Sequence, residues 1–255
     1  MGKNTKVEKK NKRRKIIFNM ALFITLFTLS TLFMFNSQLF NIKNIEVKGN
    51  NILSKDEIIN ISGISKGENI FKMKRSTTIE RINSLPYIKE AYIKRKIPNT
   101  ILIDIIERQE KMLIKNISMF LTVDQDGYIL NQVESEVENL PIIIGLDVDK
   151  VVPGDNVFAG IEYKNLIDFI DEGNNIGLLD QIKEIDLSIA KDINILLNNG
   201  IHIAFGTLDD VEYRLRLLNE ILKDIEKKDL KCSKIIMNKG KHPVLVLDDQ
   251  ERGIK

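Results

Sequence analysis

Residues 44–71 read NIEVKGNNILSKDEIINISGISKGENIF, and this stretch decides the fold of the first half of the chain. From Ile45 onward, apolar and charged residues alternate with the period of a strand that has one buried face. A glycine-asparagine turn follows, and Ser54 and Glu57 then have the spacing of a capping box. The stretch therefore predicts a strand followed by a helix that begins at Ser54 and ends at Gly63.

The residues that follow predict one more helix and two more strands. A helix over about 74–85 is stopped by Pro86. Strands are expected over 88–96 and 101–106, joined by a tight turn at Pro98-Asn99, because proline presets φ and asparagine tolerates unusual φ values. The order β-α-α-β-β predicts a small sheet with two helices on one face.

Before this region lies a stretch without charged side chains. Residues 16–35 read IIFNMALFITLFTLSTLFMF, and the segment 16–36 is long enough to cross the hydrocarbon core as a helix of roughly 30 Å. Its hydroxyl groups can bond to the preceding helical turn. A cleaved signal peptide and a buried soluble helix are the alternatives, but bulky residues at 32–35 occupy the positions where cleavage needs small side chains. We therefore expect a retained transmembrane helix.

The charge of the chain is unevenly distributed. The net charge is +2, but residues 1–15 contain eight basic residues and one acidic residue, which leaves −5 on the remainder. A basic tail before an apolar helix predicts a cytoplasmic N-terminus and an extracytoplasmic body. The tail lacks interleaved aromatic residues, so contact with anionic lipid explains it better than nucleic-acid binding does.

Residues 110–248 predict a larger α+β domain with a mainly antiparallel sheet, followed by a short tail at 249–255. Helices are expected over 157–171 and over 208–227, the second capped by Thr207. The heptad spacing of the second helix also allows a coiled coil with a partner, but six positions favour packing on its own sheet. The expected strands lie at 113–117, 120–123, 140–146, 182–187, 193–197, 201–205, 233–237 and 243–247.

Two short motifs in this region predict hairpins. Asn198-Asn199-Gly200 lies between two alternating stretches, which is the strongest short hairpin signal in a sequence. Asp124-Gln125-Asp126-Gly127 could suggest a calcium loop, but Tyr128 and Ile129 stand where further oxygen ligands are required. We therefore interpret it as a hairpin turn without metal.

Residues capable of catalysis are few. The chain has two histidines, His202 and His242, and one cysteine, Cys232, without a pattern that sets a nucleophile beside its base or gathers metal ligands. No hydrolase, metalloprotease or phosphate-loop motif is present. We therefore expect a protein that is not an enzyme and that uses no cofactor, metal, small-molecule substrate or nucleic acid. The alternative is a membrane-anchored cell-wall hydrolase or transferase.

In their order, three features resemble the FtsQ/DivIB family of cell-division proteins: the basic tail with its anchor, the stretch 44–71, and LPYIKEAYIKRKIPNTILIDIIER at 85–108. The later stretches IHIAFGTLDDVEYRLRLLNEILKDI and KIIMNKGKHPVLV are similar to the family's β domain. The resemblance implies a POTRA domain at 40–109 and a β domain at 110–248. A secretion factor with one POTRA domain would need a membrane barrel, and no series of barrel strands follows.

The resemblance also implies a function and a location. It implies a scaffold of the division complex, concentrated at the septum as a single-pass (type II) plasma-membrane protein. The expected partners are FtsL-like and DivIC/FtsB-like proteins, together with the septal peptidoglycan synthase complex. The last two strands would bind them by accepting a further strand at the sheet edge. The candidate partner-binding residues are Ile235, Ile236, Met237, Asn238, Val244, Leu245 and Val246.

Overall fold

The chain has two compact units, which are described separately. The computed structural model describes residues 4–117, 119–148, 150–159, 164–189, 191–240 and 242–247. One unit contains Met1–Ser84 and Ile88–Glu107, and the other contains Leu85–Tyr87 and Arg108–Lys255.

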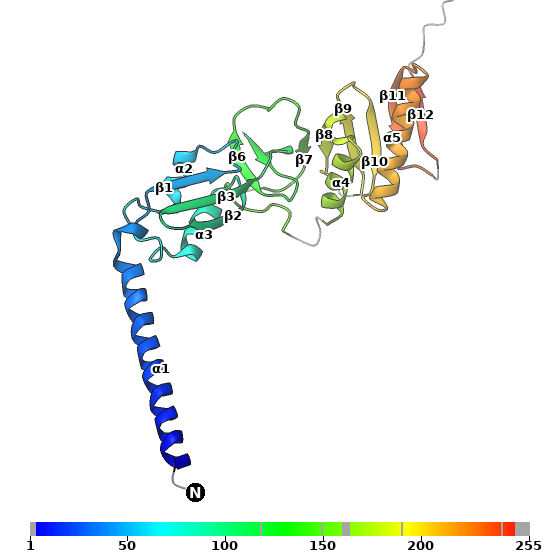
Figure 1. Cartoon of the computed structure of the whole chain (residues 1–255). Helices are drawn as coiled ribbons and strands as arrows, with labels where there is room; N and C mark the ends of the chain where they lie inside the picture. Colours follow the sequence, from blue (N-terminus) through cyan, green and yellow to red (C-terminus); the bar gives the residue numbers. More distant parts are fainter. Residues whose placement is uncertain are drawn as a thin grey trace, which may run out of the picture. The chain divides into compact units, whose positions relative to one another are not determined.

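The first element is one continuous helix, α1 (Asn4–Asn36), drawn in dark blue in Figure 1. The span Lys10–Asn36 contains a stretch that is long and apolar enough to cross a membrane, and 0% of that stretch is buried against the rest of the chain. A helix buried in a soluble core is therefore excluded. The hydroxyl groups of Thr25 and Thr31 donate to carbonyls four residues earlier, at 2.9 and 2.8 Å, as expected for hydroxyls in an apolar helix.

The remainder of the first unit has the expected β-α-α-β-β order. In its three-stranded sheet, β1 lies beside β3 in parallel and β2 lies beside β3 in antiparallel orientation. Alternate residues of the strands fill the core, which also takes Ile58 and Ile82 from the two helices. The elements are η1 (Gln38–Phe40), β1 (Asn44–Lys48), α2 (Lys55–Ser62), α3 (Arg75–Asn83), β2 (Ile88–Lys96) and β3 (Thr100–Glu107).

Local hydrogen bonds fix the predicted helix after β1. The Ser54 hydroxyl accepts the Glu57 amide at 3.2 Å, and Gly63 ends α2 with φ of 67°. The Glu107 carboxylate accepts the amides of residues 51, 52 and 53 at 2.8 to 2.9 Å and so closes the turn. Gly49 has φ of 82°, and a Cβ there would collide with a backbone carbonyl of β3.

The second unit contains one mixed sheet of nine strands in the order β12-β11-β10-β9-β8-β7-β4-β5-β6. Five neighbouring pairs are antiparallel, whereas β4–β7, β7–β8 and β10–β11 are parallel. The strands are β4 (Met112–Lys115), β5 (Phe120–Val123), β6 (Ile129–Val133), β7 (Ile142–Ile144), β8 (Ile182–Asp186), β9 (Ile193–Leu197), β10 (His202–Gly206), β11 (Cys232–Ile236) and β12 (Val244–Leu247).

Helices α4 (Lys164–Asn175) and α5 (Val211–Lys227) bury their apolar faces in the core of this sheet. A short turn of helix, η3 (Leu179–Gln181), follows α4. The rings of Phe169 in α4 and Phe205 in β10 meet edge to face at 5.5 Å. The regularly spaced apolar residues of α5 are buried in the same core, so they pack within this chain as predicted and are not free for a coiled coil.

Both helices of the second unit begin later than predicted. Helix α4 begins at Lys164 and extends to Asn175, whereas Phe158 lies in a turn, where its amide donates to the Asn156 side chain at 2.8 Å. The part of the predicted helix at 160–163 lies outside the described residues. Helix α5 begins at Val211, because Asp210 has φ of 50° and interrupts the helix, so Thr207 does not cap it.

The motif at 124–127 forms the predicted hairpin turn between β5 and β6. The Asp124 carboxylate accepts the amides of Asp126 and Tyr128 at 3.0 and 2.8 Å, and its second oxygen pairs with Arg108 at 2.6 Å. The oxygens of this aspartate are therefore engaged by hydrogen-bond donors of the chain. Among the described residues, no cluster of side chains is suited to hold a metal ion.

Candidate partner-binding edge of the second unit

Strand β12 (Val244–Leu247) is one edge of the nine-stranded sheet, drawn in orange-red in Figure 1. It pairs with β11 in antiparallel register: Ile236 lies opposite Val244, Ile235 opposite Leu245, and Lys234 opposite Val246. An edge strand has one row of backbone groups without a neighbouring strand. Among the described residues, no strand pairs with the outer side of β12.

All four side chains of β12 are apolar, and all four are exposed, by 51%, 38%, 40% and 50% from Val244 to Leu247. Leu245 lies opposite the fully buried Ile235 and therefore shares its face of the sheet, the one covered by the helices. Val244 and Val246 lie on the opposite, open face. Both faces of the edge are consequently apolar, which is unusual for a strand in contact with water.

The pairing also shows which backbone groups of β12 face outward. The amide of Met237 donates to the Ala204 carbonyl of β10 at 2.9 Å. Backbone groups alternate in direction along a strand, so those of Ile236 face β12 and form a hydrogen-bonded pair with Val244. The backbone N–H and C=O of Leu245 therefore face the free edge.

The seven predicted site residues differ in their surroundings. Val244, Leu245 and Val246 form the exposed edge. Ile236 is half buried on the open face. Ile235 is completely buried and packs against the helices. Met237 packs against the core after β11 ends, and the exposed Asn238 donates to the Asp192 carboxylate at 2.7 Å.

Sequence reasoning missed the apolar residue Leu247 as a site residue, although it is the last residue of the predicted strand at 243–247. It also missed a row of residues across the open face of the sheet. Cross-strand register aligns Glu184, Leu196, His202 and Lys234 with Val246. These residues line an open depression of about 520 Å³ next to β12. The row joins strands distant in the sequence, so no local pattern could have revealed it.

The side chain of Arg214 ties α5 to the strands that support the edge. Its guanidinium donates to the carbonyl of Phe205 at the end of β10 and to the carbonyl of Met237, at 3.4 Å, after β11. It also lies over the Phe205 ring, 4.6 Å from the ring centre. Burial lowers the pKa of Arg214 from its ordinary value. These contacts hold together the ends of β10 and β11, the strands on which β12 is built.

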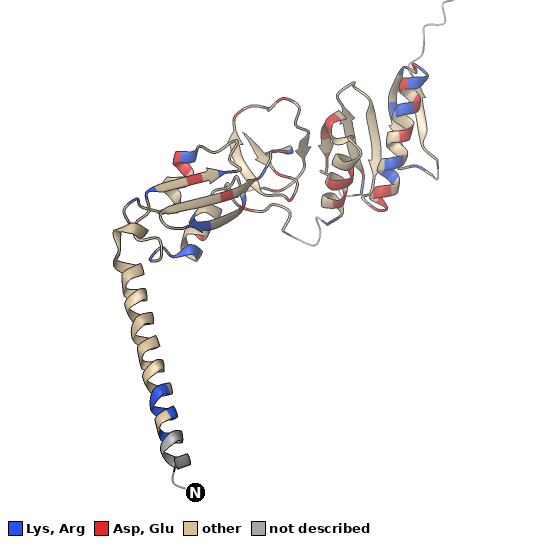
Figure 2. Ribbon diagram, in the orientation of Figure 1, with Lys and Arg blue, Asp and Glu red and all other residues tan. Residues whose placement is uncertain are grey.

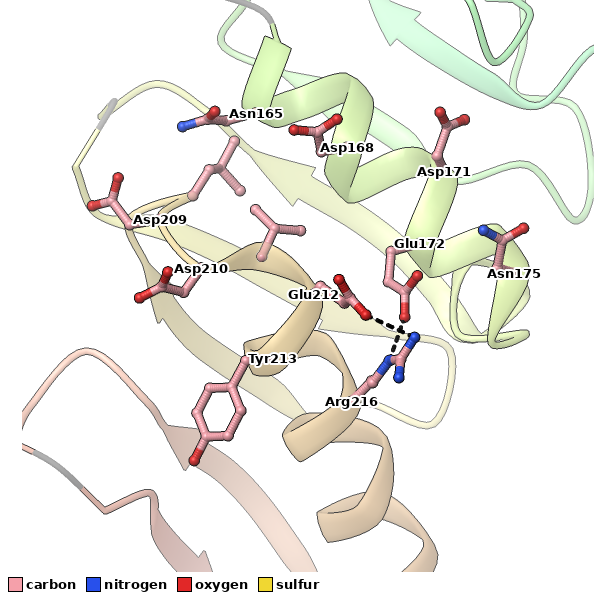
Figure 3. A pocket seen from close by; sticks show the side chains of 12 residues that line it. Asn165, Asp168, Asp171, Glu172, Asn175, Asp209, Asp210, Glu212, Tyr213 and Arg216 are labelled. Atoms are coloured by element: carbon pink, nitrogen blue, oxygen red, sulfur yellow. Dashed lines mark hydrogen bonds and ion pairs between the residues drawn. The ribbon is translucent and has the colours of Figure 1, made fainter.

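A cavity of about 1050 Å³ lies beside α4 and the start of α5 (Figure 3). Acidic side chains dominate its lining. Arg216 of α5 joins the two helices, because its guanidinium contacts Glu172 of α4 at 2.8 Å; it also contacts Glu212 of its own helix at 2.9 Å. These ion pairs raise the pKa of Arg216 further, and Glu172 is the main cause. The cavity is therefore an open, ion-paired groove between helices.

Comparisons with known proteins agree with this architecture. A family model described as "POTRA domain, FtsQ-type" matches residues 40–108, and one described as "Cell division protein FtsQ/DivIB, C-terminal" matches residues 112–236. The chain is 31% identical over 249 residues to the cell division protein DivIB of Clostridium botulinum strain Hall, with 95% of each chain covered. It is 31% identical over 207 residues to DivIB of Clostridium tetani, covering 78% of this chain and 76% of the relative.

A solved structure of the major extracytoplasmic domain of DivIB from Geobacillus stearothermophilus has 14% identity and a TM-score of 0.30, and covers 48% of this chain and 96% of that one. The assignment of the chain to a family rests on the sequence matches and not on this structural similarity. The fold defines a membrane-anchored protein with a POTRA domain followed by a larger mixed domain. The chain belongs to the FtsQ/DivIB family of cell division proteins. The strand β12 lies beyond the end of the C-terminal family match.

Proposed function

We propose that this protein is a scaffold of the cell-division complex, which binds FtsL-like and DivIC/FtsB-like proteins at the β12 edge. The observation that carries the proposal is the edge itself: four exposed apolar side chains on a strand that, within the described part of the chain, has one neighbouring strand. A partner strand would gain backbone hydrogen bonds from Leu245 and apolar contacts on both faces of the sheet. Through these partners the protein would act on the septal peptidoglycan synthase complex.

The membrane arrangement is part of the same proposal. Residues 1–15 remain in the cytoplasm because of their positive charge, and residues 16–36 cross the plasma membrane once. The POTRA domain at 40–109 and the β domain at 110–248 lie outside and gather at the septum. Partners confined to the same membrane meet at a high effective concentration, so a weak strand-addition site is sufficient.

The proposed role requires binding and no chemical step. His202 lies in β10 on the open face of the sheet, and Cys232 is half buried at the start of β11. The Cys232 thiol contacts a backbone carbonyl at 3.4 Å. A hydrolase with a cysteine or serine nucleophile would instead require that nucleophile to be hydrogen-bonded to its base.

Proline at Leu245 is the sharpest test of strand addition. It removes an amide that faces the free edge and keeps the hydrogen bonds to β11, and edge positions of this kind tolerate proline. The loss of one hydrogen bond and the bulk of the ring should weaken binding by about tenfold or more. The full-length chain in nanodiscs would be titrated with the ectodomains of its FtsL-like and DivIC-like partners.

A matched variant separates lost binding from lost folding. Leu245→Ala keeps the amide and removes only part of the side chain, so it should weaken binding less than Leu245→Pro. Proline at Ile236 is unsuitable because that amide faces β12 within the ladder. If Leu245→Pro retains the wild-type circular dichroism spectrum and binds as tightly as the unmodified chain, strand addition at this edge is wrong.

The topology and the location have separate tests. With Cys232→Ser as background, Gly240→Cys should react with a membrane-impermeant maleimide added to intact cells from which the wall has been removed. Labelling only after lysis would contradict the orientation. A fluorescent fusion to the cytoplasmic N-terminus should gather at midcell in dividing cells, and uniform fluorescence around the membrane would contradict a septal role.

A further inference from the structure

The end of α1 is attached to the POTRA domain by hydrogen bonds. The side-chain amide of Asn69, which is 6% exposed, donates to the Met34 carbonyl in the last turn of the helix at 2.9 Å. Carbonyls at a helix end have no partner within the helix and need one where water is scarce. The amide of Ile70 also donates to the Phe40 carbonyl at 2.8 Å. We call the end of α1, η1 and the loop 64–74 the junction.

Aromatic rings reinforce the junction. Phe71, from the loop, lies 6.1 Å from Phe35 at the end of α1 and 5.2 Å from Phe40 in η1, measured between ring centres. Phe40 in turn meets Phe33 edge to face at 6.3 Å. Edge-to-face and tilted contacts of this kind are attractive beyond the area that they bury. The membrane helix and the domain are therefore joined by packed side chains.

The junction exposes apolar and basic side chains together. Phe33, Phe35 and Leu39 are exposed by 60%, 38% and 54%. Exposed lysines flank them at positions 43, 66, 72 and 74. Figure 2 shows basic residues in the loop that precedes α3. Residues 40–108 contain 13 basic and 8 acidic residues, whereas residues 109–255 contain 17 and 27, so the excess positive charge lies in the domain next to α1.

We propose that the junction docks on the anionic headgroups of the bilayer that contains α1. Apolar side chains beside lysines are the composition of surfaces that lie in the headgroup region. The bilayer is the fitting occupant because α1 ends at Asn36, within one helical turn of Leu39, so the lipids of that leaflet lie against these side chains. Docking fixes the orientation of the POTRA domain on the membrane. The proposal rests on membrane insertion of α1.

The chain contains no tryptophan, so the fluorescence of a single introduced tryptophan reports how deeply that position lies in the bilayer. Phe71→Trp, in the full-length protein in vesicles of phosphatidylcholine with phosphatidylglycerol, should be quenched by brominated lipids. Ile52→Trp is the control, because it is 53% exposed in the same domain and lies beyond β1, roughly 16 Å from the start of that strand. It should remain unquenched. Leu22→Trp, in the middle of α1, reports insertion alone.

The charge dependence is tested with paired lysine variants. Each lysine near an anionic surface strengthens docking by about fivefold, so Lys72→Gln with Lys74→Gln should weaken it by about 25-fold. Quenching of Phe71→Trp should then fall toward that of Ile52→Trp. Lys48→Gln with Lys55→Gln carries the same charge change at the far end of β1 and the start of α2, and it should leave the quenching unchanged.

The outcomes distinguish docking from anchoring. If Leu22→Trp is quenched and Phe71→Trp is quenched no more than Ile52→Trp, the anchor is correct and docking is wrong. Quenching of Phe71→Trp that is equal in vesicles of phosphatidylcholine alone would also overturn docking on anionic lipid. If Leu22→Trp is not quenched, membrane insertion is wrong and docking fails with it.

Discussion

Removing the Asp124 carboxylate should cost the second unit about 4 kcal/mol of its free energy of unfolding. This side chain is 3% exposed and accepts three hydrogen bonds, from Arg108 at 2.6 Å and from the amides of Asp126 and Tyr128 at 3.0 and 2.8 Å. The Arg108 guanidinium lies 3.6 Å from the centre of the Tyr128 ring, and its side chain is 11% exposed. Truncation of Asp124 would leave the Arg108 guanidinium buried without its main counter-charge.

The magnitude follows from the burial of the pair. Removing one partner of a buried ion pair costs about 3–5 kcal/mol. The two amide hydrogen bonds add to this cost less than fully, because groups in one network are not additive. Asp124→Asn keeps an oxygen for the amides and loses the ion pair, so it should cost about half as much as Asp124→Ala.

The assay is urea unfolding of the full-length protein in detergent micelles, followed by circular dichroism. The control is Asp224→Ala, which breaks an exposed pair with Lys228 on α5 and should cost less than about 1 kcal/mol. If Asp124→Ala costs no more than Asp224→Ala, the Asp124 turn does not hold the start of this unit together.

Three further predictions concern the folded state. Gly49→Ala should destabilise the POTRA domain by about 2 kcal/mol or more, measured by chemical unfolding, because φ is positive and a Cβ would meet the backbone of β3; an effect below about 0.5 kcal/mol would contradict the positive φ. Burial and a 2.6 Å hydrogen bond to Glu110 raise the pKa of Tyr87 to about 12. The stability from this neutral phenol is complete below about pH 10, where the unfolded tyrosine titrates, and is lost as the pH rises toward 12; Tyr87→Phe should reduce that loss in unfolding midpoints taken at increasing pH, and an unchanged slope would count against it. Leu218→Ala, in the middle of α5, should cost about 2–5 kcal/mol in the same experiment, and a loss below about 1 kcal/mol would mean that α5 is not part of the core.

The sequence predicted the elements whose signals are local. The Ser54 N-cap and the asparagine-glycine hairpin before Ile201 depend on neighbouring residues, and both are confirmed. The late start of α5 was not predictable, because Asp210 adopts a positive φ that an aspartate rarely takes. Strand β7 has three residues and two parallel neighbours, and no local pattern specifies such long-range pairing.

The two strands of the candidate site could be predicted from the sequence. The backbone groups and side chains that these strands present to a partner could not. The short apolar run at 243–247 indicates a strand, but the direction of each backbone group depends on pairing through β11 to β10. Burial of Ile235 likewise depends on α5, which packs over it from a separate part of the sequence. The outward-facing amide of Leu245 therefore emerges only from the three-dimensional arrangement.

The parallel pairing of β10 and β11 has a consequence for synthesis. Parallel neighbours cannot be joined by a hairpin, so the chain crosses back through α5 before it can add β11 and then β12. The β12 edge is therefore complete only when the last residues of the sheet, 244–247, have been synthesised. A chain that ends before residue 244 still contains the three strands of the POTRA domain, but it lacks the strand that we propose as the partner-binding edge.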